Sequence, residues 1–240
     1  MSDTIWIYGT HAVEEVLKAG KRKILKVLVT EKNLAKYRND NVLGKIQNYK
    51  LQKLHFKDFA KFLNAEVSHQ GIALEIVKPD FYDEFKLLSR AKEVNRIVIL
   101  DQVTDVGNIG AMIRSMLAFG IKDLVVTEHN SVSEYAHLVK ASAGLSEKVN
   151  NYRVTNISKL LTKLKDLDFW SAGLDGAARA GVSELKKFEK LILVMGSEGK
   201  GIRDLIKKNL DLLVSIPMSE EVESLNVSNA AAITFYSLEN

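Results

Sequence analysis

Apolar and polar positions along the first 77 residues follow the periods of strands and helices in turn. The pattern predicts strands at residues 5–8, 24–29, 51–56 and 72–77, and helices at 11–19, 34–49 and 58–63. Gly9 and Gly20 fall at the turns that bound the first predicted helix, and Thr10 is its predicted N-cap. We therefore expect residues 1–77 to form a small α/β domain, which is within the size range that folds alone.

A break in the pattern follows at Lys78-Pro79-Asp80, and residues 81–93 are charged with scattered apolar positions, so we place a linker at 78–93. Beyond it, strands and helices alternate through a second domain, 94–240. Strands are predicted at 97–100, 124–127, around 154, and at 169–174, 191–195 and 212–217; helices are predicted at 109–119, 132–141, 157–164, 205–209 and 225–238. Apolar strands that each lead into a helix favour a parallel sheet covered on both faces.

The composition is that of a globular protein, with 46% hydrophobic and 27% charged residues. No run approaches the roughly 20 apolar residues of a membrane span, and the first residues lack the pattern of a signal peptide. We therefore expect a cytoplasmic protein with no membrane partner. The chain has no Cys, and its His residues (His11, His55, His69, His129, His137) lack paired ligand spacing. No metal cofactor is expected.

The net charge of +4 is unevenly distributed along the chain. Residues 1–80 contain 14 Lys and Arg against 9 Asp and Glu. Five of these cations surround Gly20: Lys18, Lys21, Arg22, Lys23 and Lys26. Such a cluster suits contact with a polyanion such as RNA, because Lys and Arg that neutralise phosphates dominate nucleic-acid affinity. A solvated lysine-rich surface is the alternative.

Three polar loops follow predicted strands of the second domain, where ligands of parallel sheets bind. The first spans residues 101–110. Asn108 is a natural N-cap, its flanking glycines leave room for an anion, and Arg114 points back toward the same end of the helix. This arrangement resembles a phosphate cradle, although the glycine spacing is not that of a Walker loop. A structural cap at Asn108 and a surface ion pair at Arg114 are the alternatives.

The second loop, residues 196–202, places three glycines after a buried strand and offers one acid, Glu198. Backbone packed close to a ligand and a plain glycine-rich turn are both open interpretations. The third loop follows the strand that ends at Pro217. Its Ser224, Asn226 and Ser228 can cap the next helix or contact a polar ligand there.

Together the three loops resemble the signature motifs of the SpoU (TrmH-like) 2'-O-ribose methyltransferases of the SPOUT class, in order and in separation. The matching stretches are Asp105-x-x-Asn108-x-Gly110-x-x-x-Arg114, Val194-Met195-Gly196-Ser197-Glu198-Gly199-x-Gly201, and Ile216-Pro217-Met218 with Ser224-Leu225-Asn226-Val227-Ser228-x-Ala230. The segment 141–144 is also similar to the family. The stretches 8–13 and 69–71, which contain His11 and His69, are similar to the substrate-binding domain of the 23S rRNA guanosine-2'-O-methyltransferases.

The resemblance implies a parallel α/β domain with a deep C-terminal trefoil knot, joined to a small L30e-like N-terminal domain that binds RNA. It also implies a homodimer whose sites are completed across the interface, and S-adenosylmethionine bound at the knot. Residues expected to hold this cofactor, largely through backbone groups, are Gly196, Ile216 and Leu225, with Met218, Ser197 and Gly176.

The implied reaction is methyl transfer to a ribose 2'-hydroxyl, expected in a guanosine of 23S rRNA. The catalytic residues implied are Arg114, Asn108, Glu198, Ser224 and Asn226. A guanidinium is always protonated, so we expect Arg114 to bind a phosphate and stabilise charge on the 2'-oxygen rather than act as a base. A tRNA 2'-O-methyltransferase and a non-catalytic RNA-binding or ribosome-assembly protein of the same fold are the alternatives.

One position departs from the family pattern. The family usually has Pro after the Asp of the first motif, and Val106 stands there in this chain. Proline would fix φ and remove a donor, so Val106 is expected to leave this loop looser.

Overall fold

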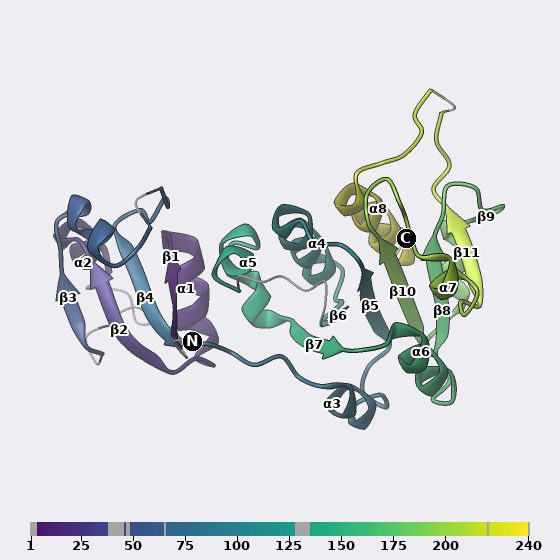
Figure 1. Cartoon of the computed structure of the whole chain (residues 1–240), viewed down its shortest axis with the longest axis horizontal. Coiled ribbons are helices and arrows are strands. Elements are labelled where there is room, and N and C mark those ends of the chain that lie inside the picture. Colours follow the sequence, from purple (N-terminus) through teal and green to yellow (C-terminus); the bar gives the residue numbers. More distant parts are fainter. Residues whose placement is uncertain are drawn as a thin grey trace. The chain divides into compact units, whose positions relative to one another are not determined.

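The computed structural model describes residues 4–37, 46, 49–64, 66–127, 135–219 and 221–239. The chain divides into two compact units (Figure 1). The smaller unit contains residues 1–80 and 134–148, and the larger contains 81–133 and 149–240. The sequence-based division differs for 134–148, which it includes in the second domain.

The smaller unit is built on a four-stranded mixed sheet. Its strands, in spatial order, are β1 (Thr4–Tyr8), β4 (Ile72–Val77), β2 (Ile24–Val29) and β3 (Leu51–Lys53). Both neighbours of β4 are antiparallel to it, whereas β2 and β3 are parallel. Helix α1 (Thr10–Ala19) contacts β1 and β4, and its apolar positions are buried, as its period predicts. The 3₁₀ helix η2 (Phe56–Lys61) contributes Phe59 to a cluster with Tyr8, Leu28 and Ala73.

Several predicted boundaries of this unit are wrong. Thr10 is the first residue of α1, not its cap, and Gly9 occupies the N-cap position. The helix predicted at 34–49 begins earlier, as α2 (Glu31–Tyr37), and residues 38–45, 47 and 48 lie outside the described part. The strand predicted at 51–56 ends at Lys53, and the helix predicted at 58–63 is the 3₁₀ helix η2, which begins at Phe56.

Residues 135–148 pack against the N-terminal helix of the same unit. They form α5 (Tyr135–Ala141) and the 3₁₀ helix η4 (Leu145–Lys148). Arg22 Nε lies 2.7 Å from Glu147 Oε2, and Lys21 Nζ donates to the Glu147 carbonyl oxygen at 2.9 Å. A Cβ on Gly144 would lie 2.5 Å from the Glu15 side chain, so glycine permits this close approach to α1. Two of the five clustered cations, Lys21 and Arg22, thus bind Glu147 of the same unit.

The larger unit is a seven-stranded sheet in which every pairing is parallel, as predicted. In spatial order its strands are β7 (Asn150–Val154), β6 (Asp123–Thr127), β5 (Arg96–Asp101), β10 (Leu191–Gly196), β8 (Trp170–Leu174), β11 (Leu212–Ser215) and β9 (Ala180–Gly181). The two-residue β9 has no pattern of its own and was not predicted. Residues 97–100 of β5 and 191–195 of β10 are apolar and buried, as expected of central strands in a parallel sheet that is covered on both faces.

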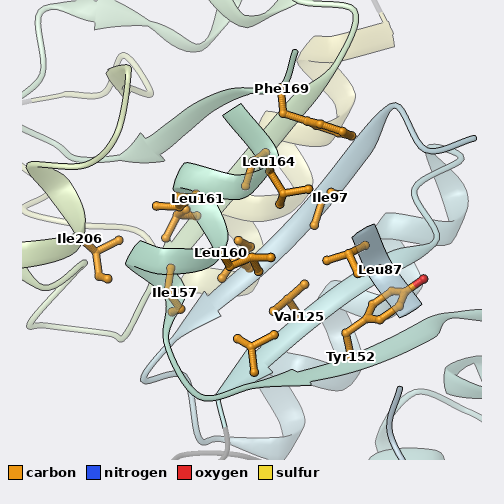
Figure 2. Close-up of a cluster of buried hydrophobic side chains, with 14 of the residues drawn as sticks. Leu87, Ile97, Val125, Tyr152, Ile157, Leu160, Leu161, Leu164, Phe169 and Ile206 are labelled. Atoms are coloured by element: carbon orange, nitrogen blue, oxygen red, sulfur yellow. The ribbon is translucent and has the colours of Figure 1, made fainter. Parts of the chain in front are cut away.

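Figure 2 shows the core on one face of this sheet. Ile97 and Ile192 project from the strands toward α6 (Ile157–Lys165), whose Leu160 and Leu164 are fully buried. The remaining elements are α3 (Glu84–Ser89), α4 (Val106–Ala118), the 3₁₀ helix η5 (Val182–Lys187), α7 (Asp204–Lys207) and α8 (Val227–Glu239). Helix α8 contacts α4 and the central strand β10.

The stretch predicted as a linker contains α3 and contributes to this core. Leu87 is fully buried there, and Ala91 is nearly so. Tyr82 forms a β-bridge with Tyr152 of β7, and its amide donates to the Asn151 carbonyl. Residues 81–93 therefore belong to the larger unit.

Candidate functional site

A cavity of about 330 Å³ lies at the carboxyl ends of β8, β10 and β11. This volume is within the range of small-molecule pockets. All six residues predicted to hold a cofactor line it, together with two predicted catalytic residues: Gly176, Gly196, Ser197, Ile216, Met218, Leu225, Glu198 and Ser224. The structure thus gathers residues from three separate strand ends, which Figure 1 shows for β10 and β11 at the same edge of the sheet.

The loop after β10 is a tight turn closed on itself. Ser197 and Gly201 exchange two backbone hydrogen bonds, at 3.2 and 2.8 Å. A Cβ on Gly196 would lie 2.1 Å from the Gly201 carbonyl carbon, so Gly196 is required by its own loop. Gly199 has a φ of +78°, and a Cβ there would meet nothing within 4 Å. The loop is a glycine-rich turn, and it also borders the cavity, so its backbone could lie close to a ligand. The two interpretations of this loop are therefore compatible.

An ion pair between the buried Asp101 and the exposed Arg203 fixes the far end of this loop. Asp101, at the carboxyl end of β5, is fully buried. Its carboxylate accepts from the Arg203 amide at 3.0 Å and from Arg203 Nε at 2.8 Å. Asp101 ends β5, and Arg203 stands at the end of the loop that follows β10. These bonds therefore join the carboxyl ends of two neighbouring strands.

Asn226 connects the three loops. Its Oδ1 accepts from the Ser228 amide at 2.9 Å and from Ser228 Oγ at 2.6 Å, which caps α8. Its Nδ2 donates to Asn108 Oδ1 at 2.9 Å and to Glu198 Oε2 at 3.4 Å. One carboxamide therefore caps a helix and joins residues from the other two loops beside the cavity.

The helix after the first loop begins three residues earlier than predicted. Asp105, not Asn108, is the N-cap of α4, and its carboxylate accepts from the Asn108 amide at 2.6 Å. The prediction of Asn108 as cap is wrong because the aspartate already holds that position. The side chain of Asn108 is thereby available to Asn226. Val106 is the first residue of α4, a position that proline suits, so it lies in the helix rather than in a loose loop.

Arg114 lies two turns farther along α4 and is exposed. It does not line the cavity, and its side chain makes no hydrogen bond or ion pair with any residue that the structure describes. The structure therefore brings Asn108, Glu198, Ser224 and Asn226 together, while Arg114 stands apart with its guanidinium in solvent.

The sequence interpretation missed a charged pair that lines the cavity. Asp175 Oδ2 lies 2.6 Å from Lys207 Nζ, and Asp175 Oδ1 accepts from the Ala177 amide. The bond to Lys207 lowers the pKa of Asp175 below its ordinary value. An acid directly after a strand was a usable signal for Asp175, whereas nothing in the sequence singled out Lys207.

The cavity suits a small cofactor held by peptide groups. Ile216 and Leu225 are half-buried, and no hydrogen bond among the described residues uses their backbone groups. Lys207 is already paired with Asp175, but Glu198 and Lys200 also line the cavity and offer partners for a ligand that carries both charges. In the described ranges no group of three or more His, Asp or Glu could hold a metal ion. No described helix is long and apolar enough to cross a membrane.

Two family models match the chain. The SpoU rRNA Methylase family matches residues 95–236, and the RNA 2'-O ribose methyltransferase substrate-binding model matches residues 6–82. A Staphylococcus aureus (strain MSSA476) protein named as a TrmH family tRNA/rRNA methyltransferase is 34% identical, over 98% of this chain and 95% of that protein. A Bacillus subtilis (strain 168) protein named in the same way is 32% identical, over 96% and 93%.

Solved structures share the fold at low identity. The SpoU methyltransferase AviRb from Streptomyces viridochromogenes, in complex with AdoMet, matches with a TM-score of 0.79 and 19% identity, over 98% of this chain and 89% of that chain. An AdoMet-bound rRNA methyltransferase from Sinorhizobium meliloti matches with a TM-score of 0.78 and 17% identity, over 99% and 87%.

Proposed function

The chain belongs to the SpoU rRNA Methylase family, whose members use S-adenosylmethionine to methylate tRNA or rRNA, and on this premise we propose a specific reaction. The enzyme transfers a methyl group to a ribose 2'-hydroxyl, in a guanosine of 23S rRNA. The similarity of residues 6–82 to a ribose-methyltransferase substrate-binding model supports the ribose as acceptor. The 23S rRNA target follows from the sequence resemblance, and a cytoplasmic location is part of the same proposal.

One observation carries the proposal: Asn226 joins Asn108 and Glu198 beside a cavity at the strand ends. The peptide groups of Gly196, Ile216 and Leu225 would hold the cofactor, with Ser197, Met218 and Gly176 around it. When bound, S-adenosylmethionine supplies an electrophilic methyl carbon on a sulfonium. The residues that meet at Asn226 would orient the nucleotide so that its 2'-oxygen approaches that carbon in line.

The 2'-oxygen would gain the methyl group that S-adenosylmethionine supplies, S-adenosylhomocysteine would remain as the thioether product, and the hydroxyl proton would pass to water. Arg114 would bind the adjacent phosphate and stabilise the charge that develops on the 2'-oxygen. Its exposure on α4 supports a contact with RNA rather than with a group of its own unit. A guanidinium stays protonated, so Arg114 would not itself accept the proton.

The family resemblance also leads us to propose a homodimer, a site completed by the partner subunit and a knotted C-terminal segment. Exposed apolar residues on α8 support the dimer: Ile233 and Tyr236 are 40% and 56% accessible on a helix that buries Phe235. The C-terminal segment leaves the sheet at β11, two strands away from β10, yet α8 returns to contact the central strand β10. This return path supports the proposed knot.

Single-turnover methyl transfer to 23S rRNA tests the role of Arg114. We expect Arg114→Lys to slow transfer by 10-fold or more, since an ammonium loses the two-pronged contact with phosphate, an effect on the order of 1.4 kcal/mol or more. Arg96→Lys is the matched control, because Arg96 lies at the amino end of β5 and pairs with Glu239. A wild-type rate for Arg114→Lys would contradict the role.

A further inference from the structure

An exposed aromatic ring stands on the smaller unit where the parallel strands β2 and β3 end. Phe56, the first residue of η2, is 59% accessible. A single exposed apolar side chain is common on protein surfaces, so this exposure alone has little meaning. Its surroundings distinguish it.

Phe56 is the outer ring of a three-ring stack. Its centroid lies 4.2 Å from the His69 imidazole, with 37° between the ring planes. His69 in turn stacks on the fully buried Phe59, at 4.2 Å and 10°. The stack fixes the position of Phe56 and leaves much of its phenyl surface in solvent.

An open groove of about 490 Å³ adjoins this ring. It lies between the residues that follow β2 and those at the end of β3 and after it: Thr30, Glu31, Lys32, Lys53, Leu54, His55 and Phe56. Lys53 Nζ lies 3.0 Å from Glu31 Oε2, so that acid is neutralised in place. Lys32 and His55 are exposed along the same groove.

We infer that Phe56 is a stacking platform for one unpaired base of the RNA substrate, with Lys32 contacting a phosphate that flanks that base. The inference rests on the proposed function in taking RNA as the substrate. A fixed aromatic ring beside lysines is the combination that binds single-stranded nucleic acid, because every base has a stacking face and every nucleotide a charge. Lysines at the groove do not favour a purely apolar partner. The groove also lies within residues 6–82, which match the substrate-binding model, and this favours RNA as its ligand.

Fluorescence anisotropy with the full-length chain tests the subsite. The probes are a labelled mixed-sequence RNA strand of about 12 nucleotides, a length that spans a typical single-strand site, and its duplex. We expect Phe56→Ala to weaken binding of the single strand about 10-fold and to leave duplex binding nearly unchanged, because only unpaired bases can stack. Phe56→Trp should bind at least as tightly as wild type.

Further variants separate stacking from folding and from charge. Phe56→Leu keeps an apolar side chain without a ring and should weaken binding as Phe56→Ala does. Phe85→Ala removes an exposed phenyl from the larger unit and should change nothing. Lys32→Gln should reduce the slope of log affinity against log salt by about 0.7. Wild-type affinity in both Phe56→Ala and Phe56→Leu, or an equal loss for the duplex, would overturn the subsite.

A parallel methyl-transfer assay with wild type separates the two claims. If wild type methylates 23S rRNA while Phe56→Ala binds the single strand normally, the subsite is wrong and the proposed function stands. If single-strand binding depends on Phe56 but no methyl is transferred, the subsite stands and the proposed function fails.

Discussion

Asn226 shows why a carboxamide, and not a carboxylate, occupies the start of α8. Its oxygen must accept from the Ser228 amide to cap the helix, which leaves its nitrogen directed at Asn108 and Glu198. An aspartate could cap equally well, but it would offer no donor and would place a second negative charge beside Glu198. The chemistry proposed for the site therefore needs the amide.

His69 is a buried residue of the N-terminal unit, 8% accessible, and its Nδ1 accepts from the Gly71 amide at 3.1 Å. It thus orders the turn at Gln70 and Gly71. Burial lowers the pKa of His69 below its ordinary value of 6.5, because the imidazolium would lose hydration. Protonation of Nδ1 would also remove the acceptor for Gly71.

A titration of the imidazole resonances by NMR checks this shift, with His69→Asn to assign the signal. We expect a pKa below 6.5. Because the folded pKa is depressed, the stabilising contribution of neutral His69 is complete above pH 6.5 and declines as the pH falls from there toward the folded pKa. A pKa of 6.5 or higher would contradict the buried position.

At the scale of elements, the amino end of α4 offers a test of the departure at Val106. Asp105 has φ −68° and ψ 118°, which a residue before proline adopts readily, and Val106 is the first helical residue. Proline there would remove no helical hydrogen bond and would restrict the unfolded chain. We expect Val106→Pro to raise the free energy of unfolding of the larger unit by about 0.5 kcal/mol relative to Val106→Ala.

Urea unfolding in a Trp6→Phe background measures this, because the chain has only two Trp and Trp170 then reports the larger unit alone. A free energy of unfolding for Val106→Pro below that of Val106→Ala would contradict this account. It would mean that proline removes a hydrogen bond of the Val106 amide or strains the local backbone.

The same elements explain what the sequence could predict. The spacing of apolar residues correctly predicted β5, β10, α1 and α6, because each of these elements buries a continuous face. It misplaced the start of α4, because Asp105 and Asn108 are both good caps and only the folded backbone selects one. It found the loops around the cavity because glycines and small polar residues mark strand ends. It missed Lys207, whose role depends on a contact across 32 residues.

At the scale of the whole molecule, the structure separates the cations of the smaller unit by role, which composition did not reveal. The cations around Gly20 partly serve the smaller unit itself, since Arg22 and Lys21 bind Glu147 and Lys18 binds Glu15. Lys32 and Lys53, near Phe56, belong to a different surface of the same unit. Point variants are therefore better tests of RNA binding than deletion of residues 1–77, which would leave Glu147 without Arg22.

The most direct test of the proposed reaction is mass spectrometry of nucleosides from 23S rRNA. The rRNA is taken from cells that lack this protein and is incubated with the purified chain and S-adenosylmethionine. We predict one new ribose-methylated guanosine, absent when the cofactor is omitted. Methylation of a base, methylation of tRNA alone, or no methyl transfer would contradict the proposed function.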